Sequence, residues 1–232
     1  MGLKQSGLRA SLRNVSTGVP PIPDSAVHQF KFDEGGGTTA NDSIGNLSGT
    51  IDGANWVSND FEGGFALDFD ESDYVDISEQ FVPEPKFSVA FTIEISSITD
   101  DGRVFYDDGD SEAAIQIVGR DRDGEDVNSL VFRFDSSDAF KIDESELILN
   151  DKMRVCAVGD RSTENVTLYV NGVDATASTP DGPGVESGIF TIANREPGSS
   201  RGADQIIDNF ITFDEELTEA EVQDDFNAQP WT

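Results

Sequence analysis

Residues 63–77 read Gly-Gly-Phe-Ala-Leu-Asp-Phe-Asp-Glu-Ser-Asp-Tyr-Val-Asp-Ile, which is two short alternating stretches on either side of a polar segment. Because strand side chains alternate between two faces, Leu67 and Phe69 share one face, and Val75 and Ile77 share one face. The polar residues 70–73 are turn formers that hydrogen-bond to their own backbone. The stretch therefore predicts a β-hairpin with one buried face, to which the rest of the chain adds strands.

Similar strand and turn signals recur along the chain. Apolar alternation predicts strands at residues 27–32, 50–57, 87–95 and 166–170. Asn171-Gly172 supplies the positive-φ residues that a two-residue hairpin turn requires. The segment Thr218-Glu219-Ala220-Glu221 has the pattern of a capping box and predicts one short C-terminal helix. Many short strands at this spacing indicate an all-β, two-sheet antiparallel sandwich.

The chain is strongly acidic and yet rich in core-forming residues. Its net charge is -31, while 36% of its residues are hydrophobic and sixteen are Phe. Disordered acidic chains lack such residues, so we expect a folded domain with an acidic surface and no nucleic-acid partner. Molar salt shortens the Debye length to about 3 Å and screens such self-repulsion. The composition therefore favours a halophilic protein, the alternative being a calcium-rich or merely acidic surface protein.

The first residues differ in charge from the rest of the chain. Residues 1–23 hold Lys4, Arg9 and Arg13 and no acidic residue, and they end in a Pro-rich segment. We divide the chain into a basic N-terminal arm or linker at 1–26 and a folded domain at 27–232. A basic arm beside an acidic body suits docking onto an acidic neighbour, such as an identical subunit. A flexible linker is the alternative.

Several classes of function are not expected from the sequence. It has no apolar run of the length that crosses a membrane, and we expect no membrane insertion and no signal peptide. Cys156 is the only cysteine, which excludes an intramolecular disulfide and a cysteine-based zinc site, and it is most simply a small core residue. His28 is the only histidine, and no obvious nucleophile lies beside it.

The order of these motifs resembles the concanavalin A-like jelly roll of the laminin G-like family. Glu71 and Phe91 depart from the residues common in that family, without disturbing the expected fold. The resemblance implies a jelly-roll sandwich, to which the charge pattern and the capping box add an extended N-terminal arm and one short C-terminal helix. The matching stretches are residues 30–35, 42–46, 64–70, 74–75, 168–172, 207–210 and 217–222.

The resemblance also implies a structural cation, because similar domains often tie the first loop to the last strand with Ca²⁺. The ligands would be Asp42, Asn46 and Asp208, whose oxygen atoms suit Ca²⁺ or Mg²⁺. Asp208 has the strand parity of Phe210, so its carboxylate is expected to point inward and to need a partner. In the alternative, Asp42 makes an Asx turn and Asp208 accepts backbone hydrogen bonds.

Related jelly rolls include glucanases with a Glu-x-Asp-x-x-Glu strand that sets two carboxyl groups on one face. Neither Glu94 nor residues 143–146 continue in that pattern. We therefore expect no enzyme. A glycan site needs an exposed aromatic side chain beside carboxylates, and Tyr106 with Asp107 and Asp108 is the cluster that the sequence offers.

Together these features predict a virion structural protein of a halophilic virus that infects an archaeon, namely a capsid turret, spike or tail component. It would be assembled in the host cytoplasm and exposed on the particle, where it would recognise host glycans. The arm at 1–26 would bind further copies or other virion proteins. A secreted or cell-surface carbohydrate-binding domain is the first alternative, and a glycan-active enzyme is the second.

Overall fold

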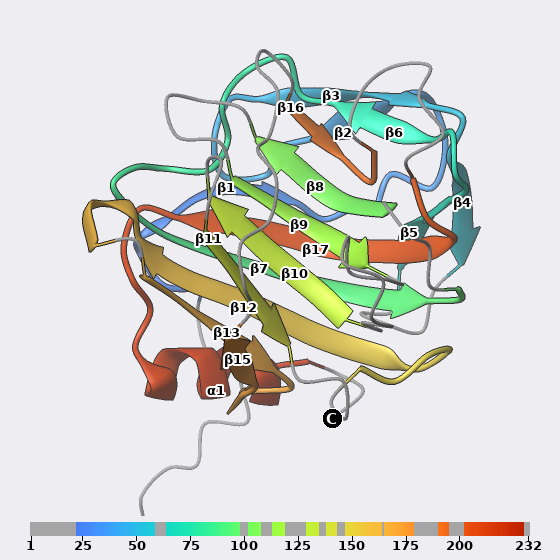
Figure 1. The fold of residues 1–232 in the computed structure, drawn as a ribbon. Coiled ribbons are helices and arrows are strands. Elements are labelled where there is room, and N and C mark those ends of the chain that lie inside the picture. Colours follow the sequence, from blue (N-terminus) through green and yellow to red (C-terminus); the bar gives the residue numbers. More distant parts are fainter. Residues whose placement is uncertain are drawn as a thin grey trace, which may run out of the picture.

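In the residues that it describes, the computed structural model folds as two antiparallel β-sheets packed face to face, with one short helix (Figure 1). In Figure 1 the sheet that contains β8 to β11 lies in front of the sheet that contains β7, β12 and β17. This arrangement confirms the predicted two-sheet sandwich. The structure describes residues 22–58, 64–97, 102–107, 113–118, 129–134, 138–142, 147–163, 165–178, 190–194 and 202–229.

In the described part of the chain, one sheet has eight strands in the order β14-β13-β12-β7-β17-β5-β4, and β1 pairs with β17 beyond this path. Its central strand β7 pairs with β12 on one side and β17 on the other, in both cases antiparallel. The strands are β1 (Ala26–Phe30), β4 (Asn55–Ser58), β5 (Phe65–Phe69), β7 (Lys86–Ile95), β12 (Lys152–Asp160), β13 (Asn165–Val170), β14 (Val173–Asp174) and β17 (Gln205–Phe213).

The other sheet has nine strands within the described residues, in the order β15-β11-β10-β9-β8-β16-β6-β3-β2. A 3-10 turn at Arg161–Thr163 follows β12, and helix α1 at Glu219–Asn227 follows β17. The strands are β2 (Thr39–Asn41), β3 (Ser48–Asp52), β6 (Tyr74–Asp76), β8 (Gly102–Asp107), β9 (Ala113–Val118), β10 (Ser129–Phe134), β11 (Asp138–Ile142), β15 (Thr176–Ser178) and β16 (Phe190–Ile192).

The main core lies between the sheets and is rich in phenylalanine. In β7 the large side chains at alternate positions, from Phe87 to Ile95, all enter this core. Phe91, Phe105 and Phe210 come from three different strands, and their ring centroids lie 5.5–6.4 Å apart. Such aromatic contacts join the two sheets and add to the stabilisation from buried apolar area.

A second core lies on the outer face of the eight-stranded sheet. Ala90 belongs to it, whereas its neighbours Val89 and Phe91 belong to the main core, so β7 is buried on both faces. Cys156 is also in this cluster, which confirms it as a core residue, and burial raises the pKa of its thiol. The cluster is completed from the chain segment that leads into α1, by Leu217, and from α1 itself, by Val222.

Both local turn and cap predictions in the C-terminal half are confirmed. Asn171 and Gly172 have φ values of 51° and 77°, and they connect the paired strands β13 and β14. Thr218 is the N-cap of α1, and Glu221 completes a capping box with it. No helix in the described residues is both long and apolar enough to cross a membrane.

The predicted hairpin at 63–77 is wrong, because its two strands lie in different sheets. β5 pairs with β4 and β17, whereas β6 pairs with β3 and β16. The turn at 70–73 exists but carries the chain from one sheet to the other. Leu67 and Val75 do both enter the main core, from opposite sides. Side-chain alternation alone cannot tell a pair of strands in one sheet from two strands that face each other.

The predicted strand at 50–57 is also divided between the sheets. It consists of the end of β3 and most of β4, and the break falls at Gly53, whose φ is 84°. Gly53 and the turn at 70–73 are thus two crossings, segments in which the chain passes from one sheet to the other. A Cβ atom at position 53 would collide with the carboxylate of Asp73 in the second crossing. The two crossings therefore pack directly against each other, and glycine is required at this contact.

Candidate functional site

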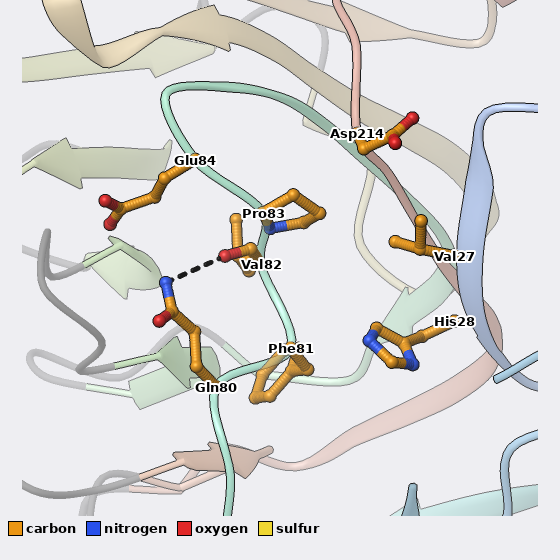
Figure 2. Close-up of a pocket in the computed structure, with 8 residues that line it drawn as sticks. All are labelled: Val27, His28, Gln80, Phe81, Val82, Pro83, Glu84 and Asp214. Carbon is orange, nitrogen blue, oxygen red and sulfur yellow. Dashed lines mark hydrogen bonds between the residues drawn. The ribbon is translucent and has the colours of Figure 1, made fainter. Parts of the chain in front are cut away.

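A pocket of about 440 Å³ lies where β1, the end of β17 and the connection between β6 and β7 meet (Figure 2). Its wall combines apolar groups with an imidazole, an amide and two carboxylates. This volume lies within the range of about 300–1,000 Å³ that is typical of small-ligand pockets. The lining residues are Val27, His28, Gln80, Phe81, Val82, Pro83, Glu84 and Asp214.

The imidazole of His28 is fixed from behind by a carboxylate. Its Nδ1 lies 2.6 Å from Oδ2 of Asp42, whose side chain is fully buried, while the His28 side chain is 21% exposed. Figure 2 shows the other ring nitrogen of His28 directed toward the pocket. Gly45 makes this approach feasible, because a Cβ atom there would collide with both side chains. His28 therefore presents one orientation to a ligand.

The carboxylate of Asp42 is held by backbone N–H groups. Its Oδ1 accepts hydrogen bonds from Gln29, Ile44 and Gly45 at 2.8–3.1 Å, and Oδ2 accepts one from Leu47 at 3.3 Å. Burial raises the pKa of Asp42, but the bonds from Gln29, His28, Gly45 and Ile44 outweigh it, and the net pKa is lowered. Asp42 is thus ionised and fully occupied in a loop that supports His28.

A second buried carboxylate holds the opposite wall of the pocket. Asp107 at the end of β8 is 2% exposed. Its Oδ2 accepts the backbone N–H groups of Phe81 and Val82 at 2.6 and 2.7 Å. Because these two residues begin the apolar wall, Asp107 is a positioning residue for the segment 80–84.

The remaining polar groups lie at the open side of the pocket. Glu84 and Asp214 are exposed and extend from the two chain segments that border it. Gln80 donates from Nε2 to the carbonyl oxygen of Val82 at 3.1 Å, which Figure 2 draws as a dashed line. The pocket can therefore contact a ligand with hydrogen-bonding groups around an apolar wall.

A second hollow, of about 300 Å³, is lined mainly by carboxylates from β5, the turn at 70–73 and the start of β17. Burial, with the charges of Asp204 and Asp70, raises the pKa of Asp68. Hydrogen bonds from the backbone and hydroxyl group of Ser72 lower the pKa of Asp70. Burial also raises the pKa of Asp73, so the hollow holds two carboxyl groups with raised pKa values beside Asp70, whose pKa is lowered.

Asp42 does not have a carboxylate oxygen available for the predicted cation. N–H donors occupy its oxygens, as the Asx-turn alternative expects, and this arrangement does not fit a cation at Asp42. Asn46 is exposed, and buried Asp208 accepts the N–H group of Asn209 at 2.8 Å. The described residues contain no group of three or more His, Cys, Asp or Glu side chains arranged for a metal. A site for Ca²⁺ or Mg²⁺ stays a prediction.

The predicted glycan cluster is only partly described. Asp107 points into the protein and binds backbone groups, a role that the sequence did not indicate. The side chain of Tyr106, the residue Asp108 and the arm residues Lys4, Arg9 and Arg13 all lie outside what the structure describes. Glycan binding by the cluster, assembly through the arm and the domain boundary at 26 therefore stay predictions.

The pocket residues other than His28 were not singled out from the sequence. They come from three segments, near residues 28, 80–84 and 214, which the fold alone brings together. The one usable signal was the single histidine followed fourteen residues later by Asp42 in a Gly- and Asn-containing loop. Nothing in that spacing indicates a pocket on its other side.

Comparisons with known proteins identify the class of domain. The family Laminin_G_3, described as the Concanavalin A-like lectin/glucanases superfamily, matches residues 69–223, more than half of the chain. The chain therefore belongs to this family, which confirms the predicted family and jelly-roll fold. Comparison with curated protein sequences gave no match.

Solved structures with the same fold come from diverse proteins. A Trypanosoma rangeli sialidase in complex with sialic acid matches with a TM-score of 0.60 and 13% identity over 88% of this chain, which spans 33% of the sialidase chain. Domain 4 of AbnA, an extracellular arabinanase from Geobacillus stearothermophilus, in complex with arabinotriose, matches with a TM-score of 0.61 and 18% identity. The match covers 87% of this chain and 98% of that domain. Botulinum neurotoxin type C, whose cell entry depends on interaction with two ganglioside molecules, matches with a TM-score of 0.61 and 21% identity. The match covers 89% of this chain and 52% of the neurotoxin chain.

Proposed function

We propose that this chain is a non-catalytic glycan-binding domain and that the pocket beside His28 holds the sugar. The observation that carries this proposal is the pocket itself, in which an oriented imidazole and two carboxylates surround an apolar wall. Sugar rings combine hydroxyl groups with apolar C–H faces, so they match such a lining. Family membership, the arabinotriose complex of the arabinanase domain and the ganglioside interaction of botulinum neurotoxin type C support the same class of ligand.

The carboxylates of the pocket favour binding over hydrolysis. Glycoside hydrolysis requires one carboxyl group that stays protonated until it transfers its proton, and burial is the usual means of raising its pKa. Glu84 and Asp214 are both exposed and lie at the open side of the pocket. They are suited to accept hydrogen bonds from sugar hydroxyl groups.

Titration with neutral oligosaccharides, including arabinotriose and lactose, tests the proposal by calorimetry in molar salt. We expect the natural chain to bind at least one of them, His28→Ala to lose that binding, and Asp224→Asn on α1 to retain it. If the natural chain binds neither these sugars nor acidic oligosaccharides, glycan binding is wrong. If His28→Ala binds as well as the natural chain, the sugar lies elsewhere.

The setting that we propose is the surface of a virion of a halophilic virus, assembled in the host cytoplasm. The basic arm, with Lys4, Arg9 and Arg13, and the acidic body support assembly with further copies or other virion proteins. Replacing the three basic residues by Ala should convert an oligomer to a monomer when mass is measured in molar salt. A chain that is monomeric before the substitution would favour a free-standing carbohydrate-binding domain.

A second candidate function, glycoside hydrolysis, rests on the hollow beside β5. Its observation is the pair of Asp68, with a raised pKa, and Asp70, with a lowered pKa, since such a separation marks acid and base partners in glycosidases. Release of reducing ends from a polysaccharide panel by the natural chain, and not by Asp68→Asn, would establish it. If neither protein releases sugar, this function is excluded for the panel.

A further inference from the structure

The pocket presents a hydrogen-bond acceptor at His28. Ionised Asp42 can only accept hydrogen bonds, so the contact of 2.6 Å requires that Nδ1 of His28 carries the proton. In the neutral imidazole the other nitrogen, Nε2, then has a free lone pair. This is the nitrogen that Figure 2 shows directed toward the pocket. When the imidazole is neutral, a ligand group beside His28 must therefore donate a hydrogen bond to Nε2.

The backbone of the pocket wall offers few donors. The N–H groups of Phe81 and Val82 are both bound by Asp107, and Pro83 has no N–H group. The N–H group of Asp214 donates to the carbonyl oxygen of Ser25 at 3.0 Å. These four lining residues can thus contribute carbonyl oxygens to a ligand, but no backbone N–H group.

The charged groups around the pocket are negative. Glu84 and Asp214 are both carboxylates, and none of the eight lining residues is Lys or Arg. Lys86 follows closely in the chain, but its Nζ lies 2.5 Å from Glu216 and 3.7 Å from Asp160, so its charge is already paired. Gln80 uses one N–H group on Val82 and retains the other. Acceptors therefore outnumber donors, and an anionic ligand would meet two like charges.

We infer that this pocket selects uncharged sugar units, bound through their hydroxyl donors, and rejects units that carry a carboxylate or sulfate group. The inference rests on the proposed glycan-binding function and adds the class of sugar. The selectivity arises from the orientation of His28 and from the carboxylates of Glu84 and Asp214.

Matched sugar pairs test the inference by calorimetry: lactose against sialyllactose, and galactotriose against trigalacturonate. Molar salt removes the long-range repulsion of the acidic surface and leaves the local contacts. We expect the neutral member of a pair to bind about tenfold more tightly or better. The double variant Glu84→Gln with Asp214→Asn should reduce this ratio several-fold. The matched control, Asp24→Asn with Glu79→Gln, removes two exposed charges outside the lining and should leave the ratio unchanged.

The outcomes separate the inference from the proposed function. Equal binding of both members, or tighter binding of the acidic one, overturns the inference while glycan binding stands. An equal loss of selectivity in the double variant and in the control assigns it to general surface charge and also overturns the inference. If no member of any pair binds, the proposed function itself fails.

Discussion

Arg154 on β12 binds Asp225 on α1 through two parallel hydrogen bonds. Nε lies 2.7 Å from Oδ2 and Nη2 lies 3.0 Å from Oδ1, while Nη1 donates to the carbonyl oxygen of Asn209 at 2.8 Å. The side chain of Arg154 is 1% exposed, so its charge depends on this partner. The pair fixes α1 over the outer core of the eight-stranded sheet and ties it to the irregular part of β17.

Removing the carboxylate of Asp225 should lower the free energy of unfolding far more than its position near the C-terminus suggests. Asp225→Ala leaves a buried guanidinium without its counter-charge, and we expect a loss of roughly 3 kcal/mol in the free energy of unfolding. Urea denaturation of the variant and of Asp224→Ala, an exposed neighbour on the same helix, measures the difference. A loss in Asp225→Ala no larger than that of the control would show that α1 is held by apolar packing alone.

Asp107 supports the pocket without lining it. Asp107→Ala would leave the N–H groups of Phe81 and Val82 buried without their acceptor, and we expect a loss of roughly 2–4 kcal/mol in the free energy of unfolding. Sugar affinity should fall as well, because the wall loses its anchor. Asp107→Asn keeps an acceptor oxygen and should retain most of both. If Asp107→Ala and the natural chain bind sugar with equal affinity, Asp107 does not position the pocket wall for binding.

Local patterns predicted the elements of this fold better than their partners. The Asn171-Gly172 turn and the cap at Thr218 need only a few consecutive residues, and both are confirmed. The hairpin prediction for 63–77 was wrong because alternation does not show whether two strands pair in one sheet or face each other from two sheets. That choice depends on the other strands that pack beside each of them. Gly53 marks one crossing and contacts Asp73 in the other, but this contact joins residues twenty positions apart.

The site was less predictable than the fold for the same physical reason. Asp42 was selected as a metal ligand because similar domains often bind Ca²⁺ between the first loop and the last strand, yet backbone donors within that loop satisfy its carboxylate. Its contact with His28 depends on the bridge between Phe30 and Asp42, which places the loop beside β1. Gln80, Glu84 and Asp214 have no local pattern that distinguishes them from the many other polar surface residues.

Salt should stabilise the domain. The net charge of -31 produces self-repulsion that ions screen, so we expect Tm to rise by at least about 5 °C between dilute buffer and molar NaCl. For a chain of this size, about 1 kcal/mol corresponds to roughly 2–4 °C. Sucrose at matched osmolarity changes water activity without screening and should have a smaller effect. If Tm is the same in dilute buffer and in NaCl, the halophilic interpretation is wrong.

Asp42 should give acid sensitivity to the loop behind His28. Its pKa in the folded protein is lowered from the ordinary value of 3.8, so it stabilises the fold above that value. This contribution is lost as the pH falls through the lowered pKa. The difference in unfolding free energy between the natural chain and Asp42→Asn should therefore be largest above about pH 4 and shrink below it. Urea denaturation at a series of pH values measures this difference. Asp224→Asn is the control for the loss of one exposed carboxylate.

Calcium provides the complementary test of Asp42. Because N–H donors already occupy both of its oxygens, we expect Asp42→Asn to lose roughly 1–3 kcal/mol, equally in Ca²⁺ and in chelator. A ligand of a bound ion would behave differently, since an ion that binds only the folded state adds stability that depends on its concentration. Thermal unfolding of both proteins with Ca²⁺, Mg²⁺ or EDTA decides between these cases. A loss of stability that appears only with a divalent cation would return Asp42, with Asn46 and Asp208, to the predicted metal site.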